Sequence, residues 1–287
     1  MDDLIFEHTS NGAVLTRVNG APVHAVVPDC YDGHPVCAVG KYAFAQQAQL
    51  KSVTLPDGIC AVGDHAFYNC RSLEQLTLHR GIRSIGDGVF KNCESLRRIS
   101  MQSMQHVRQL ISDFPHELTL TMAFDGGQTA VLLFPEYDYE YLENVPPREF
   151  RSVTYGSGSF YRMCASGTGV DFAQYDKTFA RAVREDTPET AQTIAFLRLL
   201  YPYSLRQQYR DQYLTYLSEH AREAAETVLR QRNVPRLELL LADNLLEQDA
   251  LETAIARAAE LDFPEAVSLL MDHRLARFGA RRRRFVL

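Results

Sequence analysis

Hydrophobic positions between residues 40 and 101 recur at a fixed interval. Glycine stands at positions 40, 63 and 86, so that both steps are 23 residues. Four further columns keep an apolar character at the same interval: Phe44, Phe67 and Phe90; Leu50, Leu73 and Leu96; Val53, Leu76 and Ile99; Leu55, Leu78 and Met101. A unit this short cannot bury so many apolar side chains alone, so neighbouring units must stack like on like. The pattern predicts a solenoid.

Each unit contains one segment with the character of a strand. Segments 50–56, 73–79 and 96–102 alternate apolar and polar residues after a leading leucine. The glycine column predicts a backbone bend that a Cβ atom would obstruct. The phenylalanine column predicts an internal ladder of rings.

The middle of the chain is also β-like. Residues 118–134 read "LTLTMAF", "DGGQ" and "TAVLLF", which predicts a hairpin whose glycines supply positive φ angles. A second β-like segment covers residues 151–165. We expect these strands to cover the open face of the last repeat, because an uncovered edge invites aggregation.

Beyond Asp171 the period of the apolar residues becomes helical. Thr187 is predicted to cap a helix with Pro188 at its first position, and Ser204 to cap a helix that runs to Leu217. Further helices are predicted at 221–231, 235–242, 248–260 and 264–274. A shift of 30 residues lays 224 on 254, 237 on 267 and 240 on 270, which indicates two stacked helical hairpins. The predicted fold class is therefore α+β, with boundaries at 1–105, 106–170 and 171–287.

The repeats resemble a known family. "ICAVGDHAFYNCRSLEQLTLHRG" and "IRSIGDGVFKNCESLRRIS" are similar to the BspA-like leucine-rich repeat, over about residues 12–104. Gln47 departs from the pattern, since it stands where Cys70 and Cys93 stand in the next two units. The resemblance implies a curved β-solenoid used for recognition. In the helical half, "AAELDFPEAVSLL" is similar to ankyrin units, although the 30-residue shift is shorter than the usual 33 or so and the ankyrin turn signature is missing.

Composition narrows the range of partners. The 30 basic and 36 acidic side chains nearly balance, so no whole-chain charge favours nucleic acid or an anionic membrane. The acidic start "MDDLIFEHTSNG" lacks the features of a secretory signal, and no apolar run reaches spanning length. We therefore expect a protein that stays in the cytoplasm, has no membrane partner and keeps its six cysteines as buried thiols.

The search for chemistry predicts no cofactor, no metal site and no catalytic residue. Gly40-Lys41 belongs to the repeat rather than to a phosphate-binding loop, and "HELTL" has Leu120 where a zinc peptidase needs its second histidine. Four cysteines stand at intervals of 23, 10 and 23 residues: Cys37, Cys60, Cys70 and Cys93. They are open to a zinc interpretation, but stacked thiols explain them more simply, since structural zinc sites use close pairs of ligands.

Three surfaces are candidates for binding a partner. The first is the strand face, with two columns: Ser52, Gln75 and Arg98; Thr54, Thr77 and Ser100. These residues equally suit ordinary solvent-facing strand positions. The second is "PEYDYEYLENVPP", whose Tyr137, Tyr139 and Tyr141 suit an interface or an amphipathic strand that buries its rings. The third is the run from Arg281 to Arg284, the only hint of nucleic acid, for which a solvated tail is the default.

These observations predict a non-enzymatic interaction protein or scaffold with a protein partner, because repeat arrays present extended surfaces. The alternative is an enzyme, or a substrate-selecting subunit of one, with a site in a cleft between the two halves near residues 155–164. Converging His, Asp or Cys side chains there would favour this alternative.

Overall fold

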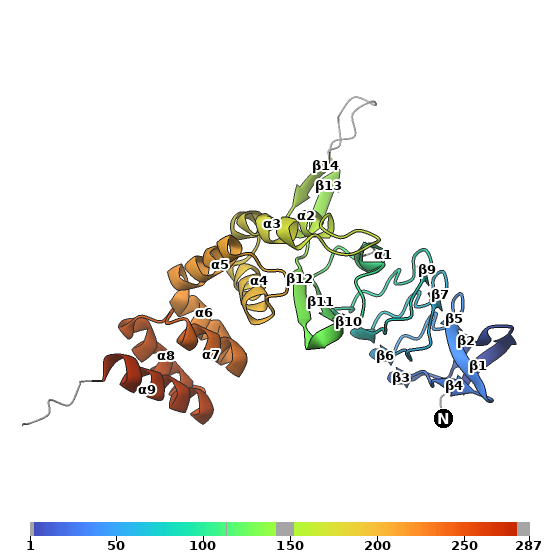
Figure 1. Cartoon of the computed structure of the whole chain (residues 1–287), viewed down its shortest axis with the longest axis horizontal. Coiled ribbons are helices and arrows are strands. Elements are labelled where there is room, and N and C mark those ends of the chain that lie inside the picture. The colour runs from blue at the N-terminus through green and yellow to red at the C-terminus, as the bar shows by residue number, and fades with distance from the viewer. Residues whose placement is uncertain (1–2, 113, 142–151, 280–287) are drawn as a thin grey trace, which may run out of the picture. The chain divides into compact units, whose positions relative to one another are not determined.

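The computed structural model describes residues 3–112, 114–141 and 152–279, with the backbone alone for 3, 139–141, 152 and 153 (Figure 1). The chain forms two compact units, Met1–Asp186 and Thr187–Leu287. The division lies after Asp186 rather than at the predicted 170/171 boundary. One reason is that Tyr175 donates a hydrogen bond to the carbonyl of Leu133 at 2.6 Å, which ties this helical segment to the β-rich part.

The first unit contains two main sheets. One has the order β1-β2-β5-β7-β9, with β4 paired to β5, and the other has the order β12-β11-β10-β8-β6-β3. The strands of the first sheet are β1 Asp3–Thr9, β2 Gly12–Asn19, β4 Cys30–Tyr31, β5 His34–Val39, β7 Ala61–Val62 and β9 Ser84–Ile85. Those of the second are β3 His24–Val26, β6 Ser52–Thr54, β8 Gln75–Thr77, β10 Arg98–Met101, β11 Leu118–Ala123 and β12 Thr129–Phe134.

The predicted repeat strands are confirmed, and the 23-residue interval is also their pairing register. Strands β6, β8 and β10 are parallel, with Val53 opposite Leu76 and Leu76 opposite Ile99. All three of these side chains are buried. Because a one-residue slip would turn every one of them to the other face, the apolar column fixes the register.

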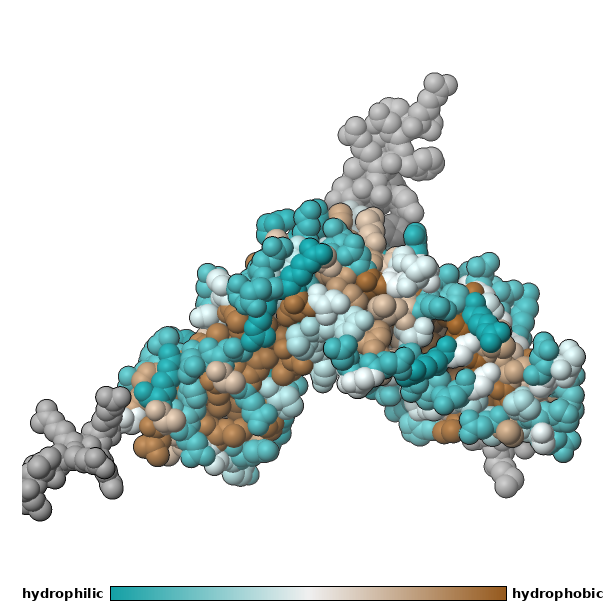
Figure 2. Space-filling view, in the orientation of Figure 1, coloured by the Kyte–Doolittle hydropathy of each residue, from teal (hydrophilic) through white to brown (hydrophobic). Residues whose placement is uncertain are grey.

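The core of the repeats lies around the phenylalanine ladder, as predicted. The rings of Phe44 and Phe67 stack with their centroids 4.9 Å apart, and those of Phe67 and Phe90 are 5.6 Å apart. Phe114 continues the row beyond the last full repeat, at 5.6 Å from Phe90. In Figure 2 hydrophilic residues cover most of the visible surface of the repeat region, with hydrophobic residues showing in scattered places.

The glycine column marks a close approach between neighbouring turns. A Cβ atom on Gly63 would lie 2.6 Å from the backbone N of Lys41, and one on Gly86 would lie 2.8 Å from the Cα of Asp64. Neither glycine has a positive φ angle, so a left-handed backbone is not the reason for glycine here. The reason is that the preceding turn of the solenoid leaves no room for a Cβ atom.

The predicted hairpin is confirmed and extends the second sheet. Strand β11 pairs in parallel with β10, and β12 returns antiparallel after the turn η1 Asp125–Gly127. Gly126 and Gly127 have φ angles of 79° and 77°, as the turn requires. Helix α1 Val107–Ile111 precedes this hairpin.

The segment that follows is only partly a strand. Strands β13 Asp138–Tyr141 and β14 Ser152–Tyr155 form a two-stranded sheet. The β interpretation of the rest of 151–165 is wrong, because Gly156 turns the chain at a φ of 80° and helix α2 occupies Gly158–Arg162. Helix α3 Phe172–Glu185 follows, capped by Asp171, whose side chain accepts a hydrogen bond from the backbone N of Gln174.

The second unit is helical in the described residues. Its helices are α4 Pro188–Leu200, α5 Gln207–Glu219, α6 Ala221–Arg230, α7 Val234–Ala242, α8 Gln248–Glu260 and α9 Pro264–Phe278. Thr187 caps α4 as predicted, since its side chain accepts from the backbone N of Thr190. The prediction for Ser204 is wrong: this residue has a φ of 52° in a turn, and α5 begins at Gln207.

The helical hairpins repeat as the 30-residue shift predicts. Helices α6 and α7 are joined by residues 231–233, and α8 and α9 by residues 261–263. Arg232 and Asp262, at the same place in the two links, have φ angles of 51° and 48°. Leu240 and Leu270 are both fully buried, so the same helix face supplies the core of each hairpin.

Candidate functional site

The predicted strand residues lie in two rows across one face of the second sheet. In one row Ser52, Gln75 and Arg98 pair in register, and in the other Thr54, Thr77 and Ser100 do so. Arg98 is exposed and the other five are half-buried, while the intervening column is buried. The strands therefore present alternate polar side chains away from the core, and those of the second row are all small hydroxyl residues.

The structure adds two strands to this face, which we call the polar strand face. Strand β3 places His24 beside Ser52 and Val26 beside Thr54, and strand β11 places Thr119 beside Arg98 and Thr121 beside Ser100. Val26 is 71% exposed, which is unusual for an apolar strand residue beside a threonine row. Sequence reasoning missed these residues because β3 and β11 lie outside the repeated columns.

Hydroxyl, imidazole and charged groups give the polar strand face its chemistry. His24 Nδ1 and Ser52 Oγ lie within hydrogen-bond distance at 2.8 Å. Glu74 lies between two cations, at 3.9 Å from Lys51 Nζ and 3.9 Å from Arg98 Nη2. The two ion pairs of Glu74 are long and accessible to solvent, so they leave these charged side chains free to rearrange around a partner.

The face ends where β12 begins. Leu133 and Val131 continue the two rows opposite Thr119 and Thr121, but both are apolar and buried. The ring of Phe134 meets that of Tyr175 edge-on at 6.0 Å, so α3 packs against this end of the sheet. The polar strand face is thus bounded on one side by a covered strand.

The cysteines hold successive turns together. The thiols of Cys70 and Cys93 donate to the carbonyls of Phe44 and Phe67, each at 3.0 Å. A hydrogen bond from Cys93 lowers the pKa of Cys70, against the opposing effect of burial. Gln47, which departs from the column, donates its amide to the carbonyl of Val18 at 2.9 Å. All six cysteines are free, but the prediction that they are buried is wrong for three of them, since Cys30 is exposed and Cys37 and Cys60 are half-buried. The described residues contain no group of three or more His, Cys, Asp or Glu arranged to hold a metal ion.

The tyrosine candidates are described only in part. Tyr137 is half-buried and its ring lies 4.9 Å from the guanidinium carbon of Arg162, so it packs inside the first unit. The side chains of Tyr139 and Tyr141 lie outside the described part of the chain, as does the whole run from Arg281 to Arg284.

The glycines near residue 157 form a turn. The backbone N of Ser157 donates to Asp186 Oδ1 at 2.8 Å, and its hydroxyl donates to Asp186 Oδ2. Burial raises the pKa of Asp186, against these two hydrogen bonds, which lower it. A Cβ atom on Gly158 would lie 2.8 Å from the carbonyl of Glu136, so glycine is needed for close packing here.

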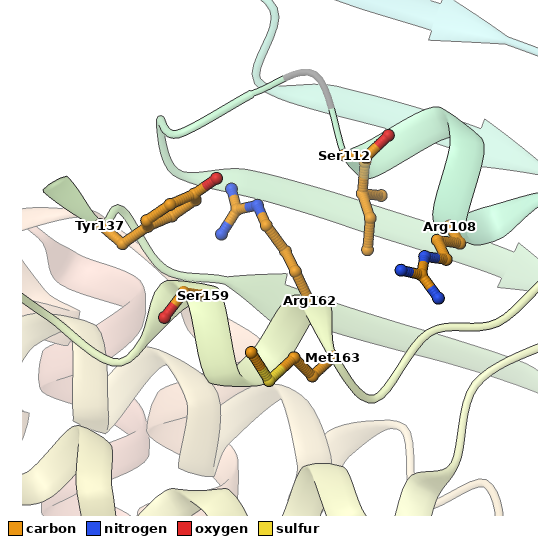
Figure 3. Close-up of a pocket in the computed structure, with 7 residues that line it drawn as sticks. Arg108, Ser112, Tyr137, Ser159, Arg162 and Met163 are labelled. Atoms are coloured by element: carbon orange, nitrogen blue, oxygen red, sulfur yellow. The ribbon is translucent and has the colours of Figure 1, made fainter. Parts of the chain in front are cut away.

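A cavity of about 320 Å³, open to solvent, lies at the surface of the first unit beside the same turn. It is lined by Arg108, Ile111, Ser112, Tyr137, Ser159, Arg162 and Met163 (Figure 3). The lining residues come from α1 and the residue after it, from Tyr137 just before β13, and from α2 and the residue after it. These three segments are far apart in the sequence. It contains Ser159, Arg162 and Met163 from the stretch 155–164, but none of the His, Asp or Cys side chains that the enzyme alternative called for.

In the described part of the chain, no helix combines the length and the apolar character that crossing a lipid bilayer requires.

Comparison with known proteins identifies the repeats. Residues 34–112 match the family described as BspA type leucine rich repeat region. A leucine rich cell surface protein from Faecalibacterium prausnitzii is 26% identical over 35% of this chain and 33% of its own, with a TM-score of 0.30. A leucine-rich repeat protein from Bacteroides capillosus is 24% identical over 42% of this chain and 93% of its own, with a TM-score of 0.34.

A leucine rich repeat protein from T. pallidum is 22% identical over 34% of this chain and 68% of its own, with a TM-score of 0.25. This chain spans about a third of the length of the Faecalibacterium protein. No curated protein matches the chain. The family match leads to one conclusion: residues 34–112 are a leucine-rich repeat region of the BspA type.

Proposed function

We propose that the protein is a non-enzymatic interaction module whose polar strand face binds a protein partner. One observation carries the proposal: two in-register rows of mainly polar side chains run over β3, β6, β8, β10 and β11, and each row ends at a buried apolar residue of β12. Small hydroxyl groups leave room for a partner backbone, and a repeated row offers the same contact on several strands. Leucine-rich repeat regions are solenoids, and solenoids supply extended binding faces.

The side chains on this face suit a partner that carries charges of both signs and an apolar group. Lys51, Glu74 and Arg98 form a short chain of alternating sign at the row of Ser52, Gln75 and Arg98. The exposed Val26 at the edge supplies an apolar contact. Protein–protein interfaces combine polar and apolar contacts of these kinds.

For the helical unit we propose ankyrin-like stacking of the hairpins α6/α7 and α8/α9. The 30-residue shift, the three-residue links with left-handed Arg232 and Asp262, and the buried alanines at Ala224 and Ala254 support it. In this arrangement the second unit adds a further surface for partners rather than a site for chemistry.

The test is affinity capture from a lysate of the native host with the wild type and the Thr54→Arg, Thr77→Arg variant. Both substitutions crowd the threonine row and add two positive charges. A matched control, Gln49→Arg with Ser84→Arg, adds the same charge at exposed positions off the row. We expect a protein retained by wild type and by the control but lost with the row variant, all three having equal thermal unfolding. Equal retention by the row variant would contradict the proposal.

A further inference from the structure

The cavity beside α2 contains a buried arginine that has no carboxylate partner. Arg162 is 8% exposed and forms no ion pair with a carboxylate in residues 3–112, 114–141 and 152–279. Its Nη1 donates to the carbonyls of Pro135 and Gly158, at 2.6 and 3.0 Å, and its Nη2 donates to the carbonyl of His116 at 2.6 Å. Neutral carbonyls satisfy these N–H groups but leave the positive charge unbalanced.

Arg162 also keeps donors that nothing accepts. A guanidinium group has five N–H donors, and only three have acceptors among the described residues. Its buried Nε has no hydrogen-bond partner. Burial lowers the pKa of Arg162 to about 10, with Tyr137 opposing the shift, so the side chain still carries its charge at neutral pH. An unpartnered buried donor beside a cavity indicates an absent acceptor.

A second arginine reaches the same cavity. Arg108, on α1, is exposed, and its side chain makes no hydrogen bond or ion pair within the described residues. Figure 3 shows its guanidinium extending from α1 toward the space where Arg162 and Met163 lie. Three hydroxyl-bearing residues, Ser112, Tyr137 and Ser159, also line the cavity.

The balance of charge in the lining favours an anion. Among the described residues, the lining has two cations and no carboxylate, and Glu136 and Asp138, on either side of Tyr137 in the chain, are exposed and outside it. Asp113 lies outside the described residues. A cavity between α8 and α9 provides a contrast, because there Arg274 already pairs with Glu252 at 3.1 Å.

The cavity also has an apolar side. Ile111 and Met163 line it, and Met163 is 76% exposed, a high value for a side chain of this size. A volume of about 320 Å³ is at the lower end of the range for small-molecule sites, which begins at about 300 Å³.

We propose that this cavity binds a small ligand that carries one oxyanion group, held by Arg108 and Arg162, and a short apolar part against Ile111 and Met163. Arginine suits this role because its planar fork matches phosphate and carboxylate oxygens in pairs. The site is separate from the polar strand face, so either proposal can fail without the other.

The test uses inorganic phosphate, phenyl phosphate, benzoate and the neutral benzyl alcohol as probes with the full chain. Isothermal titration measures affinity, and the ¹H–¹⁵N resonance of Arg162 Nε, assigned by its loss in Arg162→Lys, reports contact. We expect saturable binding of phenyl phosphate or benzoate, weaker binding of inorganic phosphate and none of benzyl alcohol. The Arg162 Nε resonance should shift as the oxyanion binds.

Arg108→Gln is the variant that tests the site. The exposed Arg108 side chain makes no hydrogen bond or ion pair within the described residues, so its replacement should leave the fold unchanged. We expect it to weaken oxyanion binding at least about tenfold, while the matched control Arg71→Gln, also exposed, leaves it unchanged. The proposal is overturned if no oxyanion probe binds at about 10 mM, roughly tenfold above a millimolar dissociation constant. It is equally overturned if Arg108→Gln binds as the wild type does. The Thr54→Arg, Thr77→Arg variant should bind the probes normally.

Discussion

The rings of Phe44 and Phe67 stack almost parallel, with their centroids 4.9 Å apart and an interplanar angle of 17°. The next pair, Phe67 and Phe90, repeats the arrangement at 5.6 Å and 13°. Phe67 therefore contacts a ring on both sides, and each turn of the solenoid supports the next through this row. The polar strand face depends on that core, because the same turns set the spacing of its rows.

Removing the middle ring should destabilise the first unit strongly. Phe67→Ala leaves a gap between two rings that the stacked turns cannot close, and we expect a loss of about 3 to 5 kcal/mol in the free energy of unfolding. Amide hydrogen exchange in β6 and β8 at rising urea concentrations measures this unit separately from the helical one. Val26→Ala, at an exposed position of the same sheet, should change stability by less than about 0.5 kcal/mol. A loss below about 1 kcal/mol in Phe67→Ala would show that the ladder is not the core.

Gly86 in the glycine column and Gly167 outside it give a matched pair of substitutions. In Gly86→Ala the new methyl group meets the backbone of Asp64 on the neighbouring turn, which cannot move without separating the turns, so we expect a cost of about 1 to 3 kcal/mol or more. Gly167→Ala adds the same methyl group where no atom lies within 4 Å, and should stay within about 0.5 kcal/mol of wild type. The same exchange measurement compares them. Equal effects would mean that the close approach of turns does not select glycine.

Cys164 makes stability depend on pH in the alkaline range. Its burial raises the thiol pKa from 9.0 to about 11, and the nearby Asp171 and Asp176 add to the shift while Thr178 opposes it. Between pH 9 and 11 the folded state keeps a proton that the unfolded state loses, so this contribution is complete below pH 9 and disappears as pH rises through 11.

We therefore expect Cys164→Ala to lose stability less steeply than wild type between pH 9 and 11. The difference in slope is at most about 1.4 kcal/mol per pH unit. Thermal unfolding across this range measures it, and Cys30→Ala, which removes an exposed thiol, should keep the wild-type slope. Parallel curves for wild type and Cys164→Ala would show that the thiol titrates alike in the folded and unfolded states.

The repeated half of the fold was predictable because the 23-residue interval determines both which residues are buried and which residues lie opposite each other on neighbouring strands. Residues 23 apart, such as Val53 and Leu76, have the same chemistry and also lie opposite each other on parallel strands. In the first sheet the repeat strands Ala61–Val62 and Ser84–Ile85 were missed because each has two residues, too few for alternation to show. Strand β3 was missed for a related reason: His24–Val26 lies before the first full repeat and joins the sheet only through tertiary pairing.

The errors lie where distant residues decide local structure. Ser204 has the residue type of a cap, but serine also suits turns, and here it adopts a left-handed angle. The turn before α2 is held by Asp186, 29 residues after Ser157, which no local pattern reveals. The cavity was not predictable at all, because Arg108, Tyr137 and Arg162 meet only in the folded chain.

Photo-crosslinking from the polar strand face tests the central claim most directly. A photoreactive amino acid at Gln75, in the middle of the first row, and one at the exposed Gln49 as control are compared in the native host. We expect Gln75 to yield one dominant crosslinked protein that Gln49 does not yield, and that disappears when Thr54→Arg and Thr77→Arg are added. The same crosslinks from both positions, or none from Gln75, would contradict the assignment of this face as the binding surface.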